Sequence, residues 1–162
     1  MKSESEMLCI LATYCSQSER CLFDVRKKIQ TENLSKEAEQ RLIDKLLHEK
    51  FIDEKRFARS FVHDKFQLNH WGRIKIGYEL KLKGIQPDVY HEAIETIIDE
   101  GEYLTALTDM LTAKKRTVKS RSPQETYQKL FRFAISKGFE NTFIIHTLKK
   151  MFKNINDDEP IP

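Results

Sequence analysis

One stretch of the sequence carries five positive charges in eight residues and no acid. These charges belong to Lys114, Lys115, Arg116, Lys119 and Arg121. Positive groups on flexible stems suit contacts with phosphates that do not read base sequence. More cations follow towards the end of the chain, at Arg132, Lys137, Lys149, Lys150 and Lys153. We expect this region, which joins a seventh to an eighth helix and continues into the last two helices, to bind a polyanion. The alternative is a linker that only keeps the protein soluble.

A second row of basic residues follows the single tryptophan, Trp71. It consists of Arg73, Lys75, Lys81 and Lys83. Acidic residues lie among and after these cations, so the row is the weaker candidate for polyanion binding. The ring of Trp71 can stack on a base, but a single tryptophan at a helix start more often anchors a core.

The charge of the chain is unevenly distributed. The net charge is +3, but residues 110–153 hold eleven lysines and arginines against two acids. Residues 1–109 hold 17 basic and 20 acidic residues. This asymmetry indicates a polyanionic or acidic partner for the basic third of the chain, with a solvated surface as the alternative.

The sequence lacks the spacings that an active site or a metal site would need. The three cysteines are six residues apart, so they would not share a helix face, and the five histidines are scattered. Neither Gly72 nor Gly77 is followed by the Lys-Ser or Lys-Thr of a phosphate loop, and no Gly-x-Ser-x-Gly turn occurs. We therefore expect no catalytic residue, no metal, no cofactor and no enzymatic activity.

The sequence also indicates where the protein works. An odd number of cysteines suits a reducing cytosol. No apolar run approaches the roughly 20 residues that span a bilayer, and the N-terminus lacks the basic start and apolar core of a signal peptide. We expect a cytoplasmic protein without a membrane partner.

Apolar residues recur at spacings of three and four along the chain, which is the pattern of amphipathic helices. Only 5 glycines and 4 prolines interrupt the 162 residues. The pattern predicts an all-α protein with about nine helices. Their expected ranges are 4–16, 19–31, 36–50, 54–68, 72–83, 88–99, 101–116, 123–137 and 141–153.

Residues 74–83 are ambiguous, because apolar and polar residues alternate there as in a strand. The corresponding segments 23–32 and 128–137 have apolar residues four apart, and Ile76 and Leu80 match that spacing. We therefore predict a helix, on which Ile74, Tyr78 and Leu82 form a second apolar side.

Several helix starts carry capping residues. Asp53 caps one helix, and Ile52 and Phe57 form a hydrophobic staple there. Ser122 caps another helix, in which Pro123 is the first residue and Glu125 completes a capping box. Pro87 begins a third helix.

A weak internal repeat places Asn33, Gly84 and Gly138 at corresponding positions, 51 and then 54 residues apart. Asn and Gly both tolerate a left-handed backbone, so each can end a helix. We predict tandem three-helix repeats over residues 1–52, 53–100 and 101–153, stacked into an elongated, curved body. The acidic residues 154–162 should form a disordered tail.

The middle of the chain resembles the bacterial regulatory protein RecX family. The segments that carry the resemblance are Phe51–Val62, Gly72–Ile76, Glu79–Leu80 and Lys83–Ile85. In the family they read as an apolar pair, Asp-Asp, Arg-Phe-Ala, then Gly, a basic residue before Ile, Glu-Leu and Lys-Gly-Ile. The match is close over about residues 50–90, with Glu54 where the family usually has its second Asp.

The resemblance implies a regulator without enzymatic activity, built from tandem three-helix units. Its implied partners are the RecA recombinase and the single-stranded DNA in the RecA filament, where family members block filament growth and reduce ATP hydrolysis and strand exchange. It further implies weak direct DNA binding and a role in recombination, DNA repair and the SOS response. The motif spacing and the caps at Asn33, Gly84 and Gly138 lead us to expect a monomer. Lys75 and Lys83 match basic positions of the family. The motif residues that would hold the middle unit together are Ile52, Asp53, Phe57, Ala58, Phe61, Gly72, Leu80, Gly84 and Ile85.

Two other functions stay open at this point. A transcription factor that binds duplex DNA would need Arg, Asn or Gln at the start of a recognition helix, and Gln124 and Gln128 offer such groups. A protein-interaction scaffold of helical repeats would dock partners on its acidic N-terminal two-thirds.

Overall fold

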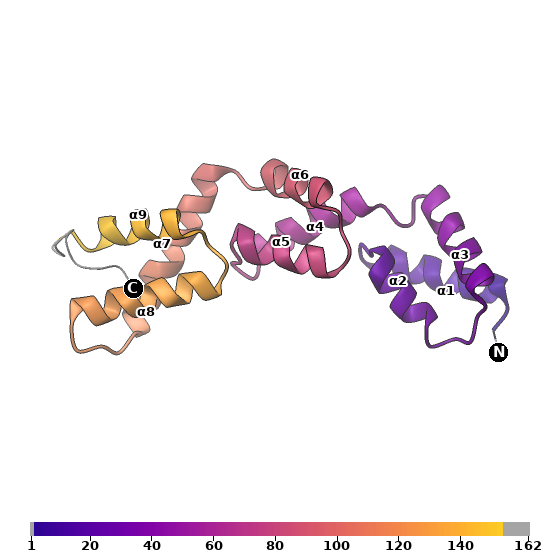
Figure 1. The fold of residues 1–162 in the computed structure, drawn as a ribbon, viewed down its shortest axis with the longest axis horizontal. Helices are drawn as coiled ribbons and strands as arrows, with labels where there is room; N and C mark the ends of the chain where they lie inside the picture. Colours follow the sequence, from indigo (N-terminus) through magenta and orange to yellow (C-terminus); the bar gives the residue numbers. More distant parts are fainter. Residues whose placement is uncertain (1, 154–162) are drawn as a thin grey trace. The chain divides into compact units, whose positions relative to one another are not determined.

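The structure is a computed structural model that describes residues 2–153 (Figure 1). Within these residues the chain forms nine α-helices and no strand, so the all-α prediction is confirmed. Residues 74–82 are helical and not extended, as predicted, and Lys83 is in the turn that follows. The helices are α1 (Glu4–Gln17), α2 (Leu22–Ile29), α3 (Lys36–His48), α4 (Glu54–Gln67), α5 (Arg73–Leu82), α6 (Pro87–Ile97), α7 (Glu100–Thr117), α8 (Pro123–Ser136) and α9 (Asn141–Met151).

The packing divides the chain into two compact units, and α4, α5 and α6 have residues in both. The first unit contains the chain up to Phe61 together with Glu79–Ala93. In it α1 and α2 both pack against α3. The core of this packing consists of aliphatic side chains that are almost fully buried: Met7, Leu11, Val25, Ile29, Leu42, Ile43, Leu46 and Ile52.

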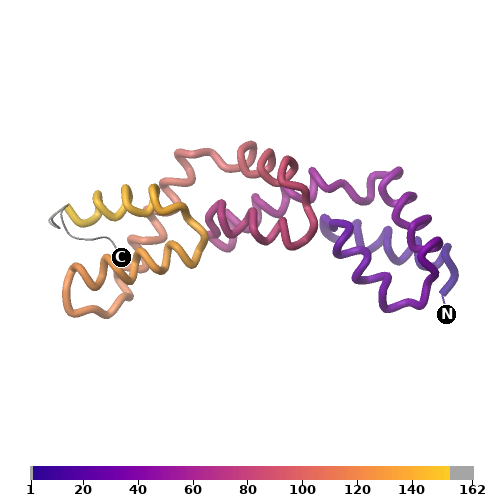
Figure 2. The backbone as a smooth tube through the Cα atoms, viewed as in Figure 1, coloured from indigo at the N-terminus to yellow at the C-terminus, as the bar shows by residue number. Residues whose placement is uncertain are grey.

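The second unit contains Val62–Tyr78 and the chain from Ile94 onward. Here α7, α8 and α9 pack against one another, and Figure 2 traces their backbones at the orange and yellow end of the chain. Tyr103 of α7 is fully buried among aromatic rings. Its ring centroid lies 4.9 Å from that of Phe139 and 5.8 Å from that of Phe66 on α4.

Capping at the helix starts follows the sequence in most respects. The Asp53 carboxylate accepts a hydrogen bond of 3.0 Å from the Arg56 N–H. The Ser122 hydroxyl accepts one of 3.1 Å from the Glu125 N–H. The predicted capping box there is wrong, because the Glu125 carboxylate accepts from the N–H of Arg121 at 2.9 Å.

Left-handed backbone ends several helices, but not at Asn33. Gly84 and Gly138 have φ angles of 79° and 92°, as predicted. Among the described residues, the other positive φ angles belong to Lys50 (61°) and His70 (57°). Asn33 follows the end of α2 at Ile29 by four residues, so no helix end is left for it to cap.

The third example of the cap is at Lys50. The Lys50 N–H donates to the Leu47 carbonyl and the next N–H donates to the Leu46 carbonyl. Gly84 and Gly138 make the same pair of bonds at the ends of α5 and α8, which is the Schellman arrangement. The repeat boundaries at residues 1–52, 53–100 and 101–153 stay a prediction, and the expected tail at 154–162 lies outside the described residues.

The described residues hold neither a metal cluster nor a membrane span. No group of three or more His, Cys, Asp or Glu side chains in residues 2–153 is placed to hold a metal ion. None of the helices in that range combines the length and the apolar character needed to cross a bilayer.

Candidate polyanion-binding surface

The first three cations of the basic stretch are on a helix. Helix α7 continues to Thr117, and the N–H of Val118 still donates to the Lys114 carbonyl at 3.1 Å. Lys114, Lys115 and Arg116 therefore form the last turn of α7, where cations interact favourably with the helix dipole. The expected helix 101–116 contains these three residues, so the expectation that the whole stretch 114–121 joins α7 to α8 is wrong, and the connection consists of residues 118–122 only.

Aromatic rings hold two of these cations. The ammonium of Lys114 lies 4.7 Å from the ring centroid of Phe133 on α8. The ammonium of Lys115 lies 4.5 Å from the ring centroid of Phe152, which follows α9. Cation–π contacts of this length are attractive, so both side chains are more restricted in position than cations of a loop would be.

Three cations line one pocket in this unit. The pocket has a volume of about 560 Å³ and contains Lys115, Arg121 and Lys153 beside Phe152 and Gln124. It brings together the end of α7, the connection to α8, the start of α8 and the end of the described chain. The sequence grouped these cations by their order in the chain, whereas the fold brings them together in space.

Glu125 follows Gln124, which lines this pocket, and a lysine pairs with it. Glu125 forms an ion pair of 3.2 Å with Lys129, one turn further along α8. The pKa of Glu125 is lowered, first by the Arg121 N–H and then by Lys129. Four further predicted cations are exposed: Lys119 in the connection, Arg132 on α8, and Lys149 and Lys150 in the last turn of α9. Lys137 is half-buried, and its ammonium donates to the Asn69 carbonyl at 3.1 Å.

Arg73, from the second basic row, is bound inside its own unit. Its guanidinium lies 3.2 Å from the Glu140 carboxylate and 4.2 Å from the centroid of the Tyr103 ring. Its backbone N–H donates to the Tyr103 hydroxyl at 2.9 Å, and that hydroxyl donates to Glu140. Burial, and then the bond to Glu140, raise the pKa of Tyr103 far above its usual value. Arg73 therefore links α5 to α7 and α9.

Lys83 is also paired within the protein. Its ammonium lies 3.0 Å from the Asp24 carboxylate in the first unit, and both side chains are mostly buried. Burial alone would raise the pKa of Asp24, but hydrogen bonds from Lys83 and from the Cys21 N–H outweigh it and lower that pKa. Of the two positions that match the basic pattern of the family, Lys83 therefore has an internal anionic partner.

The other two cations of this row have different surroundings. Lys81 is exposed on α5. The ammonium of Lys75 lies 4.6 Å from the ring centroid of Trp71, and that of Lys65 lies 4.8 Å from it. Trp71 is half-buried. Its side chain is therefore neither fully enclosed in the core nor fully open for stacking on a base, and its ring contacts two cations.

The motif residues of the middle segment are mostly buried. Ile52, Phe57, Ala58, Leu80 and Ile85 are all at most 5% exposed, while Phe61 is half-buried and Gly84 is exposed at its left-handed position. Glu54 stands where the family usually has its second Asp. Its carboxylate accepts a hydrogen bond of 3.2 Å from the N–H of Leu22 at the start of α2.

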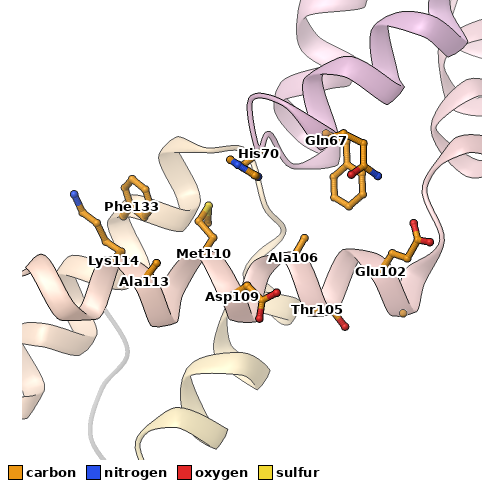
Figure 3. Close-up of a pocket in the computed structure, with 12 residues that line it drawn as sticks. Gln67, His70, Glu102, Thr105, Ala106, Asp109, Met110, Ala113, Lys114 and Phe133 are labelled. Atoms are coloured by element: carbon orange, nitrogen blue, oxygen red, sulfur yellow. The ribbon is translucent and has the colours of Figure 1, made fainter.

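The sequence did not predict an open groove of about 1000 Å³ along α7, which Figure 3 shows. Ala106, Met110 and Ala113 form part of its lining, together with Phe66 and Phe133. The signal was a row of small or flexible side chains on α7, which is recognisable only once the opposite walls are known.

Comparisons with known proteins agree with the motif. A family model for the second three-helix domain of RecX matches residues 53–94. Regulatory protein RecX of Clostridium botulinum strain Eklund 17B is 33% identical over 78% of this chain, and that of strain Alaska E43 is 35% identical over 78%. This chain covers 59% of the length of each of these two relatives.

A solved structure shares the fold. The crystal structure of RecX from Lactobacillus salivarius matches with a TM-score of 0.80 and 19% identity, over 91% of this chain and 96% of that one. The motif spacing, the family model and the curated relatives agree with this shared fold, and the chain belongs to the RecX family.

Proposed function

We propose that this chain regulates the RecA recombinase by binding the RecA–single-stranded DNA filament. Binding lowers ATP hydrolysis, filament growth and strand exchange, and thereby acts on recombination, DNA repair and the SOS response. The chain acts in the cytoplasm as a monomer, without a cofactor and without catalysis. Membership of a family whose relatives are named regulatory proteins supports this proposal.

The observation that carries the proposal is the pocket lined by Lys115, Arg121 and Lys153. Phosphate contacts from lysine and arginine position a protein without reading base sequence. A regulator of a filament that assembles on any single strand needs contacts of this kind. The cation–π contact of Lys115 with Phe152 keeps one ammonium at the pocket, which reduces the conformational entropy that binding would cost.

The middle of the chain contributes fewer free charges to this function. Arg73 and Lys83 each have an anionic partner within the protein, so we assign them a structural role. Lys81 is exposed, and Lys75 is half-buried beside Trp71. These two lysines are the candidates on α5 for contact with the filament.

The test is ATP hydrolysis by RecA on single-stranded DNA, titrated with the wild-type chain and with a Lys115→Glu/Arg121→Glu variant. We expect the wild type to inhibit hydrolysis and the double variant to need at least tenfold more protein. Lys36→Glu/Lys55→Glu makes the same change of charge at two exposed positions on α3 and α4 and should inhibit like the wild type. A wild-type chain that leaves hydrolysis and filament growth unchanged would contradict the proposal.

One observation favours a second candidate, sequence-selective binding of duplex DNA. Gln124 is exposed in the first turn of α8 and lines the cationic pocket, which is where a recognition helix carries base-reading groups. Gln128, the other predicted group, is half-buried. Binding to one duplex sequence at least a hundredfold tighter than to others would favour this candidate over the RecA filament.

A further inference from the structure

We infer that the groove along α7 receives an amphipathic helix of the recombinase, as a protein contact separate from the phosphate contacts of the cationic pocket. The inference rests on the proposed function, because it names which surface of the chain meets the protein component of the filament.

The groove has a regular row of side chains along one face of α7. Glu102, Ala106, Met110 and Lys114 are spaced four residues apart and line it together. Figure 3 shows Ala106, Met110 and Lys114 on the side of α7 that faces His70 and Gln67. From Glu102 to Lys114 the row is about 18 Å long at 1.5 Å per residue. That length matches about three turns of a partner helix.

The walls and the floor of the groove are suited to apolar side chains. Phe66 at the end of α4 and Phe133 on α8 supply aromatic surface. Ala106 and Ala113 are small, which lets a partner helix approach closely. Met110 is half-buried, and its unbranched side chain adapts to different neighbours. Amphipathic helices bind such grooves by apolar residues at spacings of three, four and seven.

The charges along the groove distinguish a protein occupant from a nucleic acid. Glu102 and Asp109 line it and are exposed, and carboxylates repel phosphates. Lys114 lies at the opposite end of the row, beside Phe133. The complementary partner helix therefore carries basic residues at the end that meets Glu102 and an acidic residue at the end that meets Lys114, with apolar residues between them.

Two substitutions test this docking surface. Ala106→Arg and Ala113→Arg each place a long, charged side chain in the groove, and Ala113 is exposed, so its replacement should leave the fold intact. Thr112→Arg is the matched control, because Thr112 is exposed on α7 and does not line the groove. Co-sedimentation with RecA filaments on single-stranded DNA, held with a non-hydrolysable ATP analogue, measures binding.

We expect both groove variants to bind at least tenfold more weakly than the wild type, and Thr112→Arg to bind like the wild type. The loss should persist at 300 mM salt, because apolar contacts are not screened. If the wild type binds the filament and both groove variants bind it equally well, this inference is overturned and the proposed function stands.

Two other results would also overturn it. No binding by the wild type would contradict the proposed function and this inference together. A dimer of the free chain that Ala113→Arg dissociates would show that a second copy covers the groove.

Discussion

Gly72 and Gly138 pass so closely that neither residue has room for a side chain. A Cβ atom on Gly72 would lie 2.4 Å from the carbonyl carbon of Gly138, and one on Gly138 would lie 2.3 Å from the Cβ of Lys75. Two backbone hydrogen bonds hold the crossing: the Gly72 N–H donates to the Lys137 carbonyl at 2.7 Å, and the Ile74 N–H donates to the Gly138 carbonyl at 3.0 Å. The motif glycine therefore fixes the start of α5 against the end of α8.

Gly72→Ala should lower the free energy of unfolding by about 1–3 kcal/mol, because the backbone must shift to admit the methyl group. Urea denaturation followed by circular dichroism measures the change. Gly84→Ala is the comparison, because a Cβ there meets nothing within 4 Å and only the left-handed φ of 79° is strained. It should cost about 1–2 kcal/mol. A Gly72→Ala variant as stable as the wild type would show that the crossing can relax freely.

Tyr103→Phe should destabilise the second unit by about 1–3 kcal/mol, because it leaves the Arg73 N–H without its acceptor. The loss should also depend on pH. The folded state raises the pKa of Tyr103 through burial and the bond to Glu140, whereas the unfolded value is about 10. The stability that this hydroxyl contributes is thus fully present below pH 10 and falls as the pH rises above it.

Unfolding midpoints in urea at pH 7 and at pH 10.5 provide the measurement. The difference between wild type and Tyr103→Phe should shrink at the higher pH. Tyr78→Phe is the matched control, since Tyr78 is 59% exposed and should behave like the wild type at both values. A difference that stays constant with pH would mean that the Tyr103 hydroxyl keeps an ordinary pKa.

Local pattern was sufficient to predict the helices, since the apolar period and the capping residues act over a few positions. Helix α5 is the exception, because its local alternation indicated a strand and only the comparison with residues 23–32 and 128–137 predicted a helix. The sequence also predicted the left-handed turns at Gly84 and Gly138. It missed Lys50 and His70, because lysine has no preference for that conformation and histidine, although enriched there, also occurs widely elsewhere. The Gly72–Gly138 crossing joins positions far apart in the chain, and no local pattern encodes it.

The candidate site was less predictable for the same reason. Composition identified the cations but not their partners, so Arg73 and Lys83 could not be distinguished from the exposed Lys81. Only the fold brings Glu140 to Arg73 and Asp24 to Lys83. It also places Lys153 beside Arg121 in one pocket, although 31 positions separate them in the sequence.

Lys83→Met should lower the free energy of unfolding at pH 7 by about 1–3 kcal/mol, because it leaves the mostly buried Asp24 carboxylate without its cation. The pKa of Asp24 is lowered in the folded wild type. The stability from this pair is therefore present above the unfolded pKa of about 3.9 and is lost as the pH falls through the folded value.

Denaturation at pH 7 and at pH 3 measures this effect, and the advantage of the wild type over Lys83→Met should be smaller at the lower pH. The matched control is Lys81→Met. Lys81 is two positions from Lys83 and its side chain is exposed, so its replacement should leave the free energy of unfolding unchanged. If Lys83→Met and the wild type are equally stable at pH 7, Lys83 has no structural role and is again a candidate for contact with the filament.

The cationic pocket predicts a specific dependence of binding on salt. If Lys115, Arg121 and Lys153 each contact one phosphate of a single strand, they contribute about −2 to the slope of log K against log salt, at roughly −0.7 per contact. Replacing all three with Gln should therefore reduce the slope by about 2. Between 50 and 200 mM salt, the factor by which the affinity of the variant falls should be roughly 20 times smaller than the factor for the wild type.

Fluorescence anisotropy of labelled single strands carrying RecA, at four salt concentrations, measures both slopes. The matched control is Lys36→Gln/Lys45→Gln/Lys55→Gln, which removes the same charge from exposed positions on α3 and α4. If the control reduces the slope as much as the pocket variant, net charge governs binding and the pocket has no special part. If the pocket variant weakens binding without changing the slope, its cations contact acidic groups of the recombinase, because screening of such pairs does not follow counterion release.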